Sequence, residues 1–142
     1  MEVKEIFETF RRVLTNHYAD FHGRARRTEF WRYILAYLVV LIFLSILGIP
    51  LLLRVVEIAL LLPTLGIIVR RLHDVDRSWW LILVPIVPAF LMVSLLYLFW
   101  PLGVLFALVT VACSAYLIYL YVLPGTPGQN QYGPDPKAVA AA

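Results

Sequence analysis

The chain has 142 residues, of which 62% are hydrophobic and only 15% are charged, and its formal net charge is +3. Soluble domains carry about 25% charged residues, so this composition argues against a soluble globular protein and favours a single domain in a membrane. The one cysteine, Cys113, lies within an apolar run, and it excludes both an intrachain disulfide and a cysteine cluster for a metal.

Residues 1–22 are predicted to form an amphipathic helix, because their apolar residues recur at spacings of three and four. The apolar face consists of Val3, Ile6, Phe7, Phe10, Val13, Leu14 and Tyr18. Beside a membrane, such a helix lies in the interface with this face down. The alternative is that the same face packs on the rest of the protein. The segment lacks the cleavage site of a signal peptide, so the next apolar run is expected to act as an uncleaved anchor.

Four apolar segments are predicted to cross the membrane as helices. They are residues 31–53, 55–70, 79–99 and 102–123. A helix rises about 1.5 Å per residue, so about 20 apolar residues cross a hydrocarbon core of about 30 Å. The second segment is short, and Pro63 and Gly66 predict a kink in it. The spacing of Arg54 and Glu57 allows them to pair on one helix. The last two segments divide at Pro101, because the run is too long for one span.

The basic residues predict how these helices are oriented. Residues 1–32 carry seven of the twelve lysines and arginines, and residues 70–77 carry three, whereas the opposite end carries only Arg54. Because cytoplasmic segments are enriched in lysine and arginine, the N-terminus, the 70–80 segment and the tail 124–142 are predicted to be cytoplasmic. The four spans would then bring three polar segments to one side of the membrane.

These three segments contain the motifs GRARR, RRLHD and PGTPG, in this order. The first is Gly23 to Arg27 with Glu29 and Trp31, the second is Arg70 to Asp74 with Arg77 and Ser78, and the third is Pro124 to Gly128 with Asn130, Tyr132 and residues 133–136. In these motifs the sequence resembles the family called domain of unknown function 805, small bacterial inner-membrane proteins of the YhaH type. The resemblance implies a multi-pass protein of the bacterial inner (plasma) membrane, and it brings no established activity, substrate or cofactor.

The resemblance covers most of the chain, with a departure before the PGTPG motif. Family members have a shorter apolar stretch there, and a single span would put the tail on the other face of the membrane. The longer stretch in this chain predicts two spans, and therefore a tail on the same face as the 70–80 segment. The expected fold class is thus an all-α membrane protein with four transmembrane helices, an N-terminal interfacial helix and a turn-rich C-terminal tail.

Arginines dominate the three motifs and outnumber the acids nearby. The candidate ligand-binding or anion-binding residues are Arg24, Arg26, Arg27, Arg70, Arg71, His73 and Arg77. Arginine forks bind carboxylate or phosphate through paired hydrogen bonds, and basic residues near a membrane attract anionic headgroups. The alternative is that these arginines act only as a topology signal and as helix-stabilising partners of local acids.

A second set of residues is expected to form a structural polar cluster with the arginines. This set is Glu29, Asp74, Asp76, Asn130 and Tyr132. Glu29 can pair with an arginine of its own helix, or across the cluster with Arg70 or Arg71. Asp74 is expected to cap the third helix or to accept bonds from backbone and arginine, with His73 donating to a carboxylate.

The functional prediction is an inner-membrane protein whose Arg/His/Asp cluster organises the fold. The cluster would bind an anionic lipid headgroup, a small anion or a partner protein. We expect membrane lipids as partners, anionic ones above all, with a homo-oligomer left open and no nucleic acid. A small oligomeric transporter or channel is one alternative, although the spans offer few polar groups near the midplane.

An enzyme that modifies lipid headgroups is a second alternative, with His73 and Asp74 as its acid–base pair. We predict no catalytic residue, since the sequence contains neither a nucleophile elbow nor a phosphate-binding loop. We also predict no metal and no cofactor. His73, Asp74 and Asp76 are poorly spaced for one ion, and the three nearby arginines repel a cation.

Overall fold

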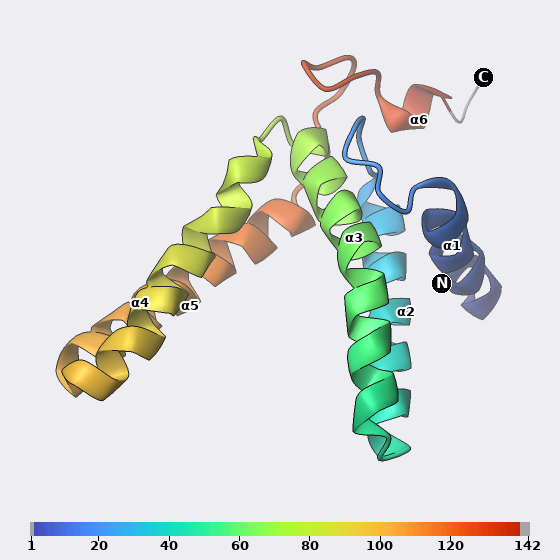
Figure 1. Cartoon of the computed structure of the whole chain (residues 1–142). Helices are drawn as coiled ribbons and strands as arrows, with labels where there is room; N and C mark the ends of the chain where they lie inside the picture. Colours follow the sequence, from blue (N-terminus) through green and yellow to red (C-terminus); the bar gives the residue numbers. More distant parts are fainter. Residues whose placement is uncertain (1, 140–142) are drawn as a thin grey trace.

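The computed structural model describes residues 2–139 of the chain (Figure 1). In chain order its elements are α1 (Val3–Asn16), α2 (Arg27–Ile46), α3 (Pro50–Asp74), the 3-10 helix η1 (Trp79–Ile82), α4 (Leu83–Leu98), α5 (Trp100–Val122) and α6 (Pro136–Val139). Within residues 2–139, four segments are long and apolar enough to cross a membrane, namely α2, α3, η1 with α4, and α5. The predicted class, an all-α membrane protein with four transmembrane helices, is confirmed.

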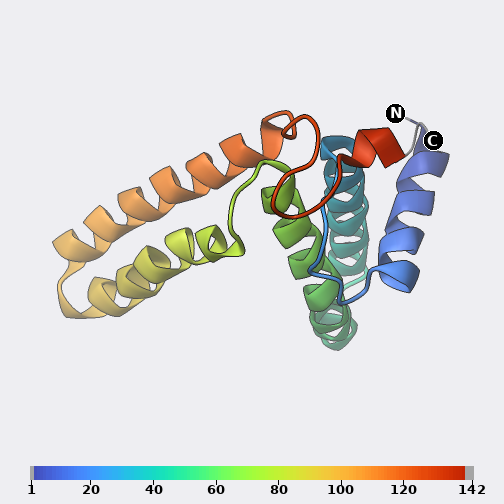
Figure 2. The same cartoon turned by 90° about the horizontal axis from the view of Figure 1, so that it is seen from above.

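The spanning helices form two antiparallel pairs that diverge from a common end, which gives the molecule the outline of an inverted V (Figure 1). One leg consists of α2 and α3, and the other consists of η1, α4 and α5; Figure 2 shows the same two legs from above. The legs meet near the end of α3, where Leu72 and Val75 pack against Leu117 and Leu120 of α5. This common end also holds the tail and α6.

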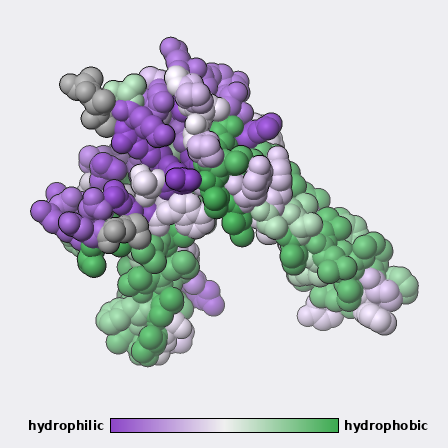
Figure 3. Space-filling view, turned by 180° about the vertical axis from the view of Figure 1, so that it is seen from behind, coloured by the Kyte–Doolittle hydropathy of each residue, from purple (hydrophilic) through white to green (hydrophobic). Residues whose placement is uncertain are grey.

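The surface of the molecule is divided along the same lines. Hydrophilic residues gather at the common end, whereas hydrophobic residues cover the two legs (Figure 3). Ile58 on α3 and Val111 on α5 are examples of large apolar side chains that the legs expose. Continuous apolar surfaces of this kind are rare in water-soluble monomers, so the legs are suited to a lipid environment. We call the hydrophilic common end the polar end.

α1 uses part of its apolar face to pack on α2. The ring of Phe10 stacks on that of Tyr33, with 5.4 Å between the centroids, and Val13 is fully buried. Closer to the N-terminus, Val3 and Phe7 are exposed. The packing alternative therefore holds for the second half of the helix, while its first half presents apolar side chains to the surroundings.

The first two spanning helices differ from the predicted bounds. α2 ends at Ile46, and α3 begins at Pro50 rather than at residue 55. Proline is well placed in the first turn of a helix, because the N–H that it lacks would have no intrahelical partner there. The spacing of Arg54 and Glu57 did predict their ion pair correctly, and Nη1 lies 2.6 Å from Oε2.

α3 has 25 residues and runs without a break through Pro63 and Gly66, so it is not the short span predicted over 55–70. Pro63 cannot donate a hydrogen bond to the carbonyl of Ala59, four residues earlier. The hydroxyl of Tyr18 donates to that carbonyl instead, at 2.6 Å. Gly66 allows the loop after α1 to lie against α3, because a Cβ at this position would be 2.9 Å from the carbonyl oxygen of Asp20.

The run that follows the 70–80 segment forms two helices, as its length predicted. The first, predicted over 79–99, begins with the 3-10 turn η1 before α4, and α5 replaces the segment predicted over 102–123 with nearly the same bounds. The chain thereby returns to the polar end. There the backbone N–H of Thr126 donates to the carbonyl of Asp74 at 2.8 Å, so the tail and the 70–80 segment lie at the same end.

Candidate functional site: a polar cluster at the end of α3

The carboxylate of Asp74, the last residue of α3, lies between two arginines. Arg24 Nε donates to Oδ1 at 3.0 Å, and Arg71 Nη1 donates to Oδ2 at 2.5 Å. The side chains are 6% exposed for Asp74, 1% for Arg24 and 0% for Arg71. Because an isolated buried charge is very costly, the carboxylate depends on these two partners, and the three groups together carry one positive charge.

The other donors of Arg24 and Arg71 hold the chain that follows. Nη1 and Nη2 of Arg24, and Nε and Nη2 of Arg71, donate to main-chain carbonyls at the end of α5 and in the tail. The acceptors are the carbonyls of Tyr121, Leu123, Thr126 and Gly128. Every guanidinium nitrogen of Arg24 and Arg71 therefore donates a hydrogen bond within the protein, and neither side chain offers a free pair of donors to an external anion.

The end of α3 is closed by the other two motif segments. The last carbonyls of a helix have no partner within the helix. Among these carbonyls of α3, that of His73 accepts Asn130 Nδ2 at 2.9 Å, and one position before them the carbonyl of Arg70 accepts the N–H of Ala25 at 2.9 Å. The carbonyl of Asp74 also accepts a hydrogen bond from the tail, so all three sequence motifs meet at the end of α3. We call this junction of the three motifs the joint.

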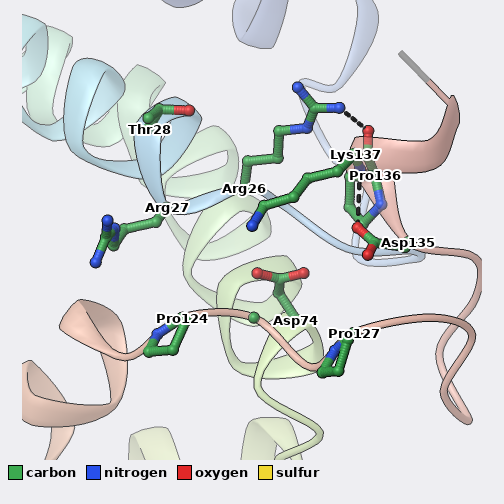
Figure 4. A pocket seen from close by; sticks show the side chains of 10 residues that line it. Arg26, Arg27, Thr28, Asp74, Pro124, Pro127, Asp135, Pro136 and Lys137 are labelled. Carbon is green, nitrogen blue, oxygen red and sulfur yellow. Dashed lines mark hydrogen bonds between the residues drawn. The ribbon is translucent and has the colours of Figure 1, made fainter. Parts of the chain in front are cut away.

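The tail approaches Asp74 very closely, and glycine is required for this. A Cβ at Gly125 would lie 2.2 Å from Oδ2 of Asp74. Figure 4 shows the chain between Pro124 and Pro127 passing directly beside the Asp74 carboxylate. The glycine of the PGTPG motif thus has a steric role, which is to admit the buried carboxylate against the backbone of the tail.

A strongly basic pocket of about 390 Å³ lies between α1, the start of α2 and α3. It is lined by Arg12, His17, Arg24, Arg26, Thr28, Glu29, Arg32, Arg70 and Pro136. Glu29 is the one carboxylate among these lining residues, and its Oε1 lies 3.7 Å from Arg12 and 3.7 Å from Arg70. We call this cavity the basic pocket.

Two arginines of the basic pocket have buried donors without an acceptor. Nε and Nη2 of Arg70, and Nε of Arg32, have no hydrogen-bond partner among residues 2–139. The Arg70 side chain is only 5% exposed, and its nearest carboxylate, Glu29, is beyond hydrogen-bond distance. Unlike Arg24 and Arg71, Arg70 is therefore a buried cation whose hydrogen-bonding capacity is largely unused.

A second cavity, of about 320 Å³, lies between the first turn of α2 and the tail (Figure 4). Arg26 separates it from the basic pocket, because its guanidinium donates to the carbonyl of Pro136, which lines both cavities. Asp135 lies at its edge and accepts the N–H of Lys137 at 2.8 Å. This hydrogen bond and a second one from the N–H of Gly128 lower the pKa of the Asp135 carboxyl below its usual value. The carboxyl therefore stays charged at neutral pH.

His73 has a partner different from the one expected, whereas Asp74 takes one of its two expected roles. The ring of His73 stacks on that of Tyr132 with 3.8 Å between centroids, and its Nδ1 lies 3.2 Å from the carbonyl of Gly23, not from a carboxylate. Of the two roles expected for Asp74, it accepts bonds from arginine, namely from Arg24 and Arg71, and does not cap a helix. Within residues 2–139, no group of three His, Cys, Asp or Glu side chains is arranged to hold a metal ion.

The remaining candidate residues lie at the edges of the cluster. Asp76 is exposed and accepts Gln131 Nε2 at 3.2 Å, and Arg77 is exposed beside it. Arg27 Nη1 donates to the carbonyl of Val122 at 3.2 Å. These contacts place Asp76, Arg77 and Arg27 around the joint, outside the buried trio.

Sequence reasoning did not single out Arg12, Thr126 or Lys137. Arg12 belongs to the charged face of α1 and reaches the basic pocket only because α1 packs on α2. Thr126 bonds through its backbone, which any residue type would provide, and through its hydroxyl, which donates to the carbonyl of Asp74 and accepts Asn130 Nδ2. The one available signal was the excess of arginine and lysine over acid in these segments.

Four spanning helices with a charged joint at one end define a small polytopic helical membrane protein. The chain belongs to the family described as "Protein of unknown function (DUF805)", which matches residues 18–134. The matched range contains all three motifs, so the resemblance that they indicated is confirmed.

Two named relatives come from Escherichia coli (strain K12). Inner membrane protein YhaH is 34% identical over 136 residues, which cover 89% of this chain and 93% of the relative. Inner membrane protein YhaI is 33% identical over 131 residues, which cover 88% of this chain and 92% of the relative. No solved structure gives a significant match to the chain.

Proposed function

We propose that the polar end faces the cytoplasm, that the Arg24–Asp74–Arg71 trio organises the fold, and that the basic pocket binds the phosphate group of an anionic membrane lipid. The observation that carries the binding role is the state of Arg70, a buried guanidinium with two donors that no group among residues 2–139 accepts. Leaving such donors unpaired costs free energy, and an anion that enters the pocket would recover it.

The charge of the pocket supports an anionic ligand. Arg12, Arg26, Arg32 and Arg70 line it against the single lining carboxylate of Glu29. Arg32 also pairs with Glu5 at 2.7 Å, and the charge of Arg24, which lines the pocket as well, is shared with Asp74. Arginine forks match the oxygens of a phosphate group through paired hydrogen bonds. The unused Nε donors of Arg32 and Arg70 are the groups that such a ligand would meet.

The position of the pocket favours a phosphate carried by a lipid. The pocket lies beside α1, whose Val3 and Phe7 side chains are exposed. Apolar residues of a surface helix insert at the boundary between headgroups and acyl chains, which would bring the pocket to the headgroup level. The lysines and arginines at this end favour the cytoplasmic side, where anionic lipids are concentrated.

The test compares Arg70→Met with Arg77→Met in nanodiscs of phosphatidylcholine that contain a fraction of phosphatidylglycerol. Both substitutions remove one positive charge from the 70–80 segment, but Arg77 is exposed and lies outside the pocket. Native mass spectrometry would measure the bound phosphatidylglycerol. We expect Arg70→Met to weaken its binding about tenfold or more, and Arg77→Met to weaken it by at most about fivefold.

Two further measurements identify the ligand. Arg70→Lys keeps the charge but loses the fork, so it should restore only part of the binding. Inorganic phosphate should compete weakly if the pocket is built for a lipid, and completely if it is built for a free anion. Equal losses in Arg70→Met and Arg77→Met would mean that the lipid responds only to the overall charge of the polar end, which would refute the proposal.

A further inference from the structure

An apolar cleft of about 700 Å³ lies between the two legs, on another face of α3 than the one that Arg70 presents to the basic pocket. One wall is formed by Leu65 and Val69 of α3, and the other by Leu83 and Ile86 of α4. These residues belong to the spanning segments, so the cleft lies within the apolar part of the molecule and next to the polar end. Its volume is typical of a site for a small ligand.

The upper edge of the cleft is aromatic and polar. His22, His73, Trp79 and Tyr132 line it there. Aromatic side chains with a polar atom are enriched where the hydrocarbon of a membrane meets its headgroups. A cleft with apolar walls and such an edge has the same division into apolar and polar parts as a membrane lipid.

One atom at this edge has no partner. Nε2 of His73 is buried and makes no hydrogen bond to any of residues 2–139. Nδ1 of the same ring lies 3.2 Å from the carbonyl of Gly23, and since a carbonyl only accepts, Nδ1 carries the proton of this bond. In the neutral imidazole, Nε2 is then an acceptor, and the group that satisfies it has to be a donor.

We propose that this cleft is a second lipid site, which holds one acyl chain between α3 and α4 and accepts a hydrogen bond from a lipid hydroxyl at Nε2 of His73. The chemical class of the ligand is a hydroxyl-bearing glycerolipid. The site needs no negative charge on the lipid, so it is independent of the basic pocket and of the function proposed for it.

The apolar walls of the cleft favour a lipid acyl chain as its occupant. Leu83 and Ile86 are partly exposed on the side of the cleft, and in a bilayer their surroundings are acyl chains. A chain that enters the cleft exchanges one apolar environment for another, so burial alone gives it little preference for the site. The hydrogen bond to His73 supplies the preference, and it selects a lipid with a free hydroxyl.

The test uses a diacylglycerol that carries a photoreactive diazirine on one acyl chain, with the full-length protein in phosphatidylcholine nanodiscs. Diacylglycerol has a hydroxyl and no phosphate, so the basic pocket does not contribute to its binding. The matched probe is the methyl ether of the same lipid, which lacks only the O–H donor. Mass spectrometry would locate the cross-linked residues and give the yield at each lipid concentration.

We expect cross-links to concentrate on Leu65, Val69, Ile82 and Ile86, with the alcohol binding about fivefold more tightly than the ether. Ile86→Trp fills the cleft and should lower the labelling of α3 by about tenfold. Val87→Trp is the matched control, because Val87 is an exposed neighbour on the same helix that does not line the cleft. His73→Asn keeps a donor for Gly23 and removes Nε2, so it should abolish the difference between alcohol and ether.

Three results would overturn the proposal. They are labelling spread evenly over the exposed faces of α2, α4 and α5, equal binding of the alcohol and the ether, and equal effects of Ile86→Trp and Val87→Trp. Little lipid labelling of the cleft, together with a dimer in native mass spectrometry that Ile86→Trp abolishes, would show that a second protein molecule fills the cleft and would also overturn the proposal. The comparison of alcohol with ether uses the unmodified chain, so it remains decisive even if His73→Asn does not fold.

Discussion

The hydroxyl of Tyr18 bonds the backbone acceptor that Pro63 leaves unused, the carbonyl of Ala59. Proline has no N–H to donate to the carbonyl four residues earlier, and the Tyr18 hydroxyl donates to that oxygen at 2.6 Å. An unpaired carbonyl within a membrane helix is costly, because lipid offers no donor. The loop after α1 therefore completes the hydrogen bonding of α3.

This relationship predicts that Tyr18→Phe destabilises the protein by about 1 kcal/mol, and that the loss depends on Pro63. In a Pro63→Ala background the helix supplies its own N–H, so the same substitution should cost much less. A double-mutant cycle, measured by reversible unfolding in mixed micelles, gives the coupling energy. Tyr119→Phe, at an exposed position on α5, is the control. An equal cost of Tyr18→Phe in both backgrounds would contradict the assignment.

Asp74 and Asp76 form a matched pair for testing the buried trio. Asp74→Asn removes the charge that both Arg24 and Arg71 require, and breaking a buried ion pair costs about 3–5 kcal/mol. Asp76→Asn makes the same chemical change two residues later at an exposed position with φ +56°, a conformation that asparagine tolerates. We expect a large fall in the melting temperature in detergent for the first and almost none for the second.

The arginine side of the trio gives an independent check. Arg71→Ala should lower the melting temperature more than Arg11→Ala, since Arg11 lies on an exposed face of α1. Similar melting temperatures for these two variants would mean that the buried charges do not contribute to stability.

Acidification should remove a contribution that Asp20 makes. Burial raises the pKa of its carboxyl, but the bond from His17 Nδ1, the bond from the His22 N–H and the charge of Arg70 outweigh burial and lower the pKa below 3.8. A carboxyl with a lowered pKa in the folded state stabilises the protein above its unfolded pKa, and the contribution is lost as the pH falls through the folded pKa. The melting temperatures of the wild type and Asp20→Asn should therefore differ at about pH 6 and converge as the pH falls below 3.8. A difference that grows on acidification would reverse the sign of this effect and refute it.

Reporter fusions test the orientation of the polar end. Fusions after Asp20, Val75 and Lys137 should report the cytoplasm, and a fusion after Val55 should report the periplasmic side, because lysine and arginine are concentrated at the polar end. The structure puts the first three positions at one end, so any split among them would conflict with the fold itself. A uniform reversal of all four would leave the fold intact and place the basic pocket on the opposite surface of the membrane.

Sequence reasoning predicted the number of spanning helices and the gathering of three polar segments at one end, because both follow from the lengths of the apolar runs. It did not predict the length of α3. Pro63 indicated a weak helix when its neighbours in sequence were considered, but the compensating donor, Tyr18, is 41 residues away from Ala59. Sequence rules for proline consider only the helix that contains it. In the folded protein, a residue outside the helix donates the hydrogen bond that the proline cannot donate.

The sequence also did not predict which arginine is fully hydrogen-bonded and which keeps unpaired donors. Arg70 and Arg71 are adjacent and chemically identical, and helical geometry turns them about 100° apart. Arg71 faces the tail and is fully bonded, while Arg70 faces α1 and α2 and keeps two unpaired donors. Which neighbour occupies each face depends on how the tail and α1 pack, and no spacing pattern encodes that.

The joint at the end of α3 has a consequence for how the protein is made. The partners of Asp74 come from residue 24, 50 positions earlier, and from residue 126, 52 positions later. As the ribosome releases the chain from its N-terminus, Arg24 and Asp74 can meet once α3 is in the membrane. The bonds from the tail to the carbonyls of His73 and Asp74 form only later. The pair α2 and α3 therefore has to stay in the membrane without these bonds while α4 and α5 are synthesised and inserted. The tail is synthesised after all four spans, so a chain that stops before Thr126 has the spans and lacks the bonds that the tail makes with Asp74 and Arg24.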